Sequence, residues 1–265
     1  MKKHNYPNDT VKATTWAEIP TYGSAGIHLT DIVGLDNQYD LVHAGRLTLI
    51  NGEDGSGKTY LANQIASNIA AQEMPTLVVT CTDSPAVRKH AIATQTIPNY
   101  DVKAGDSTSQ LLNREMNSIN DRIGNNMYIL GGYDSSAIEE VLRTRNLSLV
   151  VLDDFENAEE EMIIRLPSLL RDYEARKMLM SDLIRFARVY RVTVIVVSRC
   201  LRCVFNDLTM VRSNQWCIRN PFLSTLTCTK TDTGLKVLVE KVESSSEQYR
   251  TTVELRRNPI TNRIS

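Results

Sequence analysis

The stretch Gly52-Glu53-Asp54-Gly55-Ser56-Gly57-Lys58-Thr59 has the residues and spacing of a phosphate-binding P-loop. It comes directly after the apolar run 46–50 and opens the segment 58–72, in which apolar residues recur at helical spacing. Glycines let the backbone N–H groups of such a loop fold around phosphate oxygens, and the start of the helix adds positive potential. The alternative is a glycine-rich turn that binds nothing. The order strand, loop and helix favours the P-loop.

The P-loop interpretation assigns a role to each residue of the loop and of the first helical turn. The ammonium of Lys58 is expected to reach the terminal phosphates, and the hydroxyl of Thr59 is expected to ligate Mg²⁺. ATP and Mg²⁺ are therefore the predicted ligands. The residues expected to contact the nucleotide are Gly52, Gly55, Ser56, Gly57, Lys58 and Thr59.

A second apolar run, 147–152, ends in two acids, Asp153 and Asp154. A P-loop enzyme needs an acid at the end of another strand to hold the metal ion and its water shell. Asp153 is our first choice for this acid and Asp154 our second. The alternative is that both are solvated acids that open a loop, because Glu156, Glu159, Glu160 and Glu161 follow. We expect the later glutamates on the surface.

Short apolar runs alternate with helix-patterned segments in the middle of the chain, which is typical of a parallel sheet with crossover helices. Their unbroken apolarity predicts strands that are covered on both faces. The runs are 46–50, 76–80, 127–130, 147–152 and 192–197. Beyond residue 222 the pattern changes to three strands, of which the last two form a hairpin around Ser244-Ser245-Ser246. The sequence predicts an α/β protein with a mostly parallel central sheet, flanking helices and a C-terminal β-hairpin.

Helix signals lie between these runs. Ser84 before Pro85 is a predicted N-cap, and Ser136 with Glu139 predicts a capped helix over 136–145. The segment 107–123 keeps an apolar stripe, and a long helical stretch over 159–190 is interrupted near Pro167.

Composition limits the classes of protein that remain. Thirty basic and 31 acidic side chains give a net charge of −1, which excludes a polybasic protein that binds nucleic acid through charge alone. Residues 1–30 are rich in Thr, Pro, Gly and Asn and are predicted to form an arm or linker, with one domain over 31–265. No apolar stretch is long enough to span a bilayer, and the five cysteines are too few and too scattered for a disulfide scaffold. We expect a soluble, cytoplasmic protein.

Taken together, these residues resemble the motor domain of DnaB-type replicative DNA helicases, a branch of the RecA-like P-loop ATPases. The likeness runs from about residue 19 to residue 260 and includes Gly34-Leu35-Asp36, the P-loop, Asp153 and the final hairpin. It implies a hexameric ring that binds ATP between subunits, moves along single-stranded DNA and works with other replication proteins. The Gly-Leu-Asp element and the P-loop are shared with KaiC and RecA proteins, so an ATPase of that kind stays open.

The chain departs from the family at three catalytic positions. The glutamate that activates water in the family is replaced by the stretch 80–84, in which Asp83 is the nearest carboxylate. The family's sensor glutamine corresponds to Arg199, and its hairpin arginine corresponds to Glu243, although the hairpin lysine is retained as Lys241. The resemblance therefore implies weak hydrolysis or a substitute arginine, for which the candidates are Arg250, Arg256 and Arg257. It also leaves open an adaptor that binds nucleotide, hydrolyses it slowly and assembles with a helicase, a recombinase or DNA.

Residues 199–230 hold five basic side chains against one acid, Asp207. Trp216 and Phe222 lie among these charges and can stack on bases, as proteins that bind single strands require. The alternative is a solvated loop with two core aromatics. With the resemblance, we predict a DNA-contacting loop whose main contacts are Arg202, Arg212 and Arg219.

Overall fold

The structure is a computed structural model of the 265-residue chain. It describes residues 30, 32–36, 43–96, 117–119, 121–165, 172–199, 222–242, 248–258 and 263–265. The predicted arm at residues 1–29, most of the predicted helix over 107–123 and the predicted DNA loop at 200–221 lie outside these residues.

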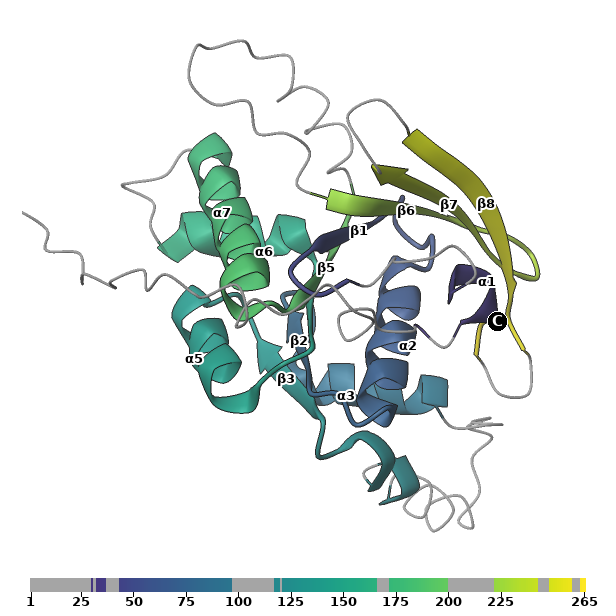
Figure 1. Cartoon of the computed structure of the whole chain (residues 1–265), viewed down its shortest axis with the longest axis horizontal. Helices are drawn as coiled ribbons and strands as arrows, with labels where there is room; N and C mark the ends of the chain where they lie inside the picture. Colours follow the sequence, from purple (N-terminus) through teal and green to yellow (C-terminus); the bar gives the residue numbers. More distant parts are fainter. Residues whose placement is uncertain are drawn as a thin grey trace, which may run out of the picture.

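An eight-stranded sheet forms the centre of the molecule (Figure 1). Its strands are β1 (Leu47–Asn51), β2 (Thr76–Thr80), β3 (Met127–Gly131), β4 (Leu149–Asp153), β5 (Thr193–Ser198), β6 (Phe222–Lys230), β7 (Gly234–Val242) and β8 (Gln248–Arg256). They lie in the order β3-β2-β4-β5-β1-β6-β7-β8. The first six strands of this order pair in parallel, and β6, β7 and β8 pair antiparallel. The predicted mostly parallel α/β sheet with a C-terminal hairpin is confirmed.

Helices cover both faces of the parallel part of the sheet (Figure 1). They are α1 (Val33–Asp36), α2 (Lys58–Ala71), α3 (Pro85–Thr96), α5 (Ser135–Arg145), α6 (Phe155–Arg165) and α7 (Asp172–Tyr190). Residues 117–119 and 121–123 are also helical. In Figure 1, α2 and α3 lie on one side of the sheet and α5, α6 and α7 on the other.

Alternate residues of each parallel strand enter two separate cores. Ile50 and Val151 belong to the core beneath α2, whereas Leu49 and Val150 belong to the core beneath α7. All four are at most 2% exposed, because neighbouring side chains of a strand point to opposite faces and both faces are covered. This double burial explains the unbroken apolar runs in the sequence.

Two predicted helix boundaries need correction. The cap of α5 is Asp134 and not Ser136, because Asp134 accepts hydrogen bonds from the backbone N–H groups of Ser136 and Ala137 at 2.9 and 3.0 Å. A carboxylate is the stronger acceptor here, and it moves the start of the helix one residue earlier. The stretch predicted as one interrupted helix is two helices, α6 and α7. The predicted cap of α3 is present, since Ser84 accepts from the N–H of Val87 at 3.4 Å.

None of the helices described by the structure is long and apolar enough to cross a membrane.

Candidate functional site

The predicted site residues gather at one edge of the sheet, where parallel strands end. β5 pairs with β1 on one side and with β4 on the other. The loop from Gly52 to Gly57 follows β1 and leads into α2, and Asp153 is the last residue of β4. In sheets of this kind ligands bind beyond the carboxyl ends of the strands.

The loop has a backbone that its glycines make possible. Gly57 has φ = 91° and directly precedes α2, a left-handed conformation that a side chain would strain. A Cβ atom on Gly52 would lie 2.7 Å from the hydroxyl of Ser56 and against the carbonyl oxygen of Cys228. The loop therefore passes so close to β6 and to its own backbone that glycine is required at position 52.

Lys58 lies over this loop rather than in solvent. Its side chain is buried, and its ammonium donates a 2.6 Å hydrogen bond to the carbonyl oxygen of Glu53. The hydroxyl of Ser56 is also buried and has no hydrogen-bond partner among the described residues. An ammonium folded over a glycine loop and an unpaired buried hydroxyl beside it fit a bound phosphate chain, because both would donate to its oxygens.

Thr59 and Asp153 meet across the site. The hydroxyl of Thr59 donates to Oδ1 of Asp153 at 3.2 Å, and Asp153 is 2% exposed. A hydroxyl and a carboxylate side by side fit Mg²⁺, which prefers few protein oxygens together with phosphates and water. Within the described residues no group of three or more His, Cys, Asp or Glu could hold a metal ion. A metal ion at this site would therefore depend on the phosphates of a bound nucleotide.

Arg88 is the site residue that the sequence interpretation missed. It lies on α3, is 1% exposed, and its Nη1 is 2.5 Å from Oδ2 of Asp153. Its Nη2 is 3.0 Å from Oδ2 of Asp83, and further hydrogen bonds reach Thr80, Thr82 and Asn63. Buried arginines need carboxylate partners. Helical spacing places Arg88 one turn before the apolar Ile92, and this inward position is the signal that could have revealed it.

Asp83 lies on the other side of the same guanidinium. One guanidinium therefore separates Asp83, the predicted water-activating carboxylate, from Asp153. The side chain of Asp83 is 38% exposed and so remains accessible to solvent at the edge of the site.

The acids after Asp153 are not all on the surface, contrary to expectation. Asp154, our second choice for the metal acid, accepts from the N–H of Asn157 at 2.9 Å and so caps α6. Burial raises the pKa of its carboxyl group. Glu159 is buried and pairs with Arg176 at 3.0 Å. The glutamates lie inward because one face of α6 packs against the sheet and α7.

Glu156 organises the end of β5. Its carboxylate accepts from the hydroxyl of Ser198 and from the backbone N–H of Arg199, the latter at 2.9 Å. The side chain of Arg199 then extends towards the P-loop, with Nη1 3.7 Å from Oδ2 of Asp54 and Nε 4.0 Å from Oδ2 of Asp154.

The remaining predicted residues lie on the C-terminal strands or outside the described part of the chain. Lys241 is on β7, in register with Ser224 of β6 and Tyr249 of β8. Nε of Arg250 lies 3.5 Å from Oε1 of Glu240, and Arg257 lies over the ring of Tyr60. The predicted residues that lie outside the described part are Glu243, Asp207, Trp216, Arg202, Arg212 and Arg219.

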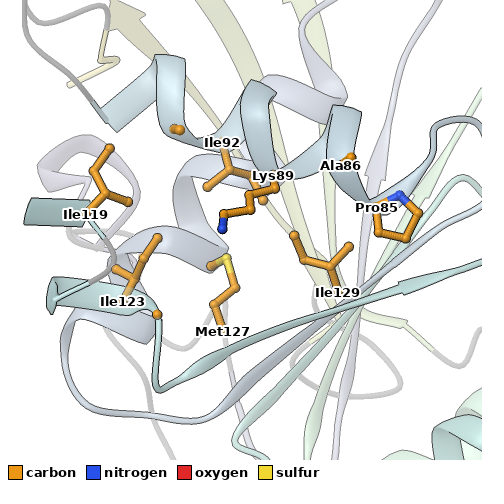
Figure 2. A pocket seen from close by; sticks show the side chains of 10 residues that line it. Pro85, Ala86, Lys89, Ile92, Ile119, Ile123, Met127 and Ile129 are labelled. Carbon is orange, nitrogen blue, oxygen red and sulfur yellow. The ribbon is translucent and has the colours of Figure 1, made fainter. Parts of the chain in front are cut away.

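A separate apolar pocket of about 350 Å³ lies between α3, β3 and the helical residues 119–123 (Figure 2). Ile92, Ile123 and Met127 line it, and Lys89 is the charged residue among its lining side chains. None of the residues that line it belongs to the P-loop, and its walls lack the donors that a phosphate requires. It is not the site described above.

Comparisons with known proteins agree with this architecture. No protein-family model matches the chain, and no curated protein matches its sequence. Among solved structures, the chain is similar to the ATPase domain of a DnaB-like helicase, with a TM-score of 0.64 and 13% sequence identity. The match covers 91% of this chain and 92% of that one. The protein therefore has the fold of a RecA-like P-loop ATPase.

Proposed function

We propose that this protein binds and hydrolyses ATP·Mg²⁺ as a motor similar to DnaB-type replicative helicases. The observation that carries the proposal is the convergence of Lys58, Thr59 and Asp153 at the ends of β1 and β4, with Thr59 and Asp153 in direct contact. The structural match to a helicase's ATPase domain, over 91% of the chain, supports it.

Each residue of the site has a definite task in this proposal. The loop N–H groups and Lys58 bind the phosphates, and Thr59 and Asp153 hold Mg²⁺. The metal ion, when bound, neutralises charge on the β- and γ-phosphate oxygens. Asp83 is the carboxylate that orients water, and Arg88 keeps Asp83 and Asp153 at a set separation.

The finer parts of the proposal come from the sequence resemblance. We infer a hexameric ring formed by residues 31–265, with residues 1–30 as an arm that docks on a neighbour. Single-stranded DNA would pass the loop that carries Arg202, Arg212 and Arg219, and Lys241 would face an adjacent ATP site. Such a motor would act in the cytoplasm beside other replication proteins.

A second candidate is an adaptor that binds nucleotide but hydrolyses it slowly. It is favoured by the ion pair between Asp83 and Arg88, which engages the only carboxylate near the family's water-activating position in the stretch 80–84. Glu243 in place of the family's arginine points the same way. A KaiC- or RecA-like ATPase is the third possibility and differs from the first in its partner rather than in its site.

The test is ATP turnover and equilibrium ATP binding, each with and without single-stranded DNA, for the wild-type protein, Lys58→Ala and Lys89→Ala. Lys89 is an exposed lysine of α3 outside the P-loop and serves as the matched control. We expect only Lys58→Ala to lose turnover and most ATP affinity. Stimulation by DNA supports the motor, and ATP binding without stimulated turnover supports the adaptor. Equal ATP binding and turnover in folded Lys58→Ala would refute both.

A further inference from the structure

Arg199 stands between the two strands that carry the P-loop and Asp153. Ser198 pairs in register with Asn51 at the end of β1, and Val197 pairs with Asp153 at the end of β4. Because the three strands run parallel, residue 199 leaves the sheet at the edge where the candidate site lies. The hydrogen bond from its N–H to Glu156 sets the point from which its side chain starts.

The guanidinium of Arg199 is placed over the mouth of the P-loop and is free to change partners. It lies 3.7 Å from the carboxylate of Asp54, within the loop, and 4.0 Å from that of Asp154. The side chains of Arg199 and Asp54 are 41% and 78% exposed, and ion pairs with this exposure are weak. A phosphate offers a guanidinium a stronger, bidentate partner. A bound triphosphate can therefore draw Arg199 away from Asp54.

The other described arginines near the site are engaged elsewhere. Arg88 lies buried between Asp83 and Asp153, and Arg250 pairs with Glu240 on the neighbouring strand. Arg257 lies over the ring of Tyr60. Arg199 differs from them because it combines contact with a P-loop residue and partial exposure.

We propose that Arg199 supplies, within its own subunit, the guanidinium that stabilises charge developing on the γ-phosphoryl group. In that step water adds to the γ-phosphorus and the bond to the β,γ-bridging oxygen breaks. The bond's electron pair stays on ADP, and a proton of the water passes to solvent. The inference rests on the proposed ATPase function. It accounts for an arginine at position 199 in a chain that has Glu243 at the position of the family's arginine.

The first experiment compares Arg199→Gln and Arg199→Lys with Arg188→Gln, an exposed arginine of α7. Arginines in this role raise phosphoryl-transfer rates by about 10³–10⁵-fold, so we expect kcat to fall about a hundredfold or more in Arg199→Gln. The Kd for ATP should change little, and Arg199→Lys should retain part of the rate. The affinity for ADP with aluminium fluoride and Mg²⁺, a transition-state analogue, should fall with kcat. Unchanged kcat and analogue affinity in Arg199→Gln, or the same losses in Arg250→Gln alone, would overturn the proposal.

The second experiment tests whether Arg199 acts on its own subunit's site. Lys58→Ala and Arg199→Gln proteins are mixed, and one carries a tag so that co-purification reports mixed assemblies. In a mixture no subunit holds both Lys58 and Arg199, so we expect no recovery of turnover. Recovery would show action across an interface and overturn the assignment. Failure of this inference is distinct from failure of the proposed function, because the latter appears as a wild-type protein that neither binds nor hydrolyses ATP.

Discussion

The hydroxyl of Thr59 and the carboxylate of Asp153 are 94 positions apart in sequence and 3.2 Å apart in space. Thr59 lies in the first turn of α2, which follows β1, and Asp153 closes β4, which is separated from β1 in the sheet by β5. The pair depends on how the sheet is ordered, and it makes two residues of the proposed metal site testable together.

Asp153→Asn should remove the Mg²⁺ dependence of ATP binding. A neutral amide retains the size of the side chain and its contact with Thr59, but it binds Mg²⁺ far more weakly than a carboxylate does. We expect ATP titrations in Mg²⁺ and in EDTA to give similar affinities for Asp153→Asn and clearly different ones for the wild-type protein. Asp154→Asn is the matched control and should keep the difference. The metal assignment is wrong if Asp153→Asn keeps it too.

Arg88→Met should destabilise the protein strongly, because it leaves the buried carboxylate of Asp153 without its cationic partner. Breaking a buried pair from one side costs about 3–5 kcal/mol, whereas replacing both partners is often nearly neutral. Urea denaturation should therefore show a large loss for Arg88→Met and a smaller one for Arg88→Met with Asp153→Asn. Arg188→Met, at an exposed position, should change the free energy of unfolding little. Additive effects of Arg88→Met and Asp153→Asn would show that the two side chains do not interact.

Cys81 and Cys228 should resist alkylation in the native protein. Burial raises the pKa of each thiol to about 12, and at Cys81 the negative charges of Glu161, Asp154 and Asp153 add to it. The thiolate is the reactive form, so its fraction at pH 8 should be about a thousandfold below that of a free cysteine and should rise only as pH approaches 12. Mass spectrometry of peptides after iodoacetamide treatment should find both residues labelled in urea and largely unlabelled without it. Rapid native labelling at pH 8 would contradict the burial of these thiols.

The DNA loop makes a prediction that depends on charge. If residues 199–230 follow a phosphate backbone, affinity for single-stranded DNA should fall steeply with salt and depend little on sequence. Arg202→Ala, Arg212→Ala and Arg219→Ala should each lower the slope of log affinity against log salt by about one. Fluorescence anisotropy over a salt series measures the slope, with Arg188→Ala as control. A slope that none of the three changes would move the DNA contact to another surface.

Local patterns predicted the sheet and the loop well. Each parallel strand lies within two residues of its apolar run, because a strand buried on both faces needs apolar side chains at nearly every position. The P-loop is equally local, since its glycines, Lys58 and Thr59 are close together in sequence and their backbone conformation follows from their own steric demands. Capping was less predictable: Asp134 competes with Ser136 for the same N–H groups, and charge and backbone geometry together decide between them.

The sequence by itself therefore determined the class of fold, the phosphate loop and Asp153 as the nearest acid on a strand. Only the tertiary structure decided that Arg88 joins Asp83 to Asp153, and that Arg199 faces Asp54. Arg88 and Asp153 are 65 positions apart, and the contact between Arg199 and Asp54 exists because β5 pairs between β4 and β1. Strand order is set by the packing of helices on both faces of the whole sheet, and no single stretch of sequence contains that information.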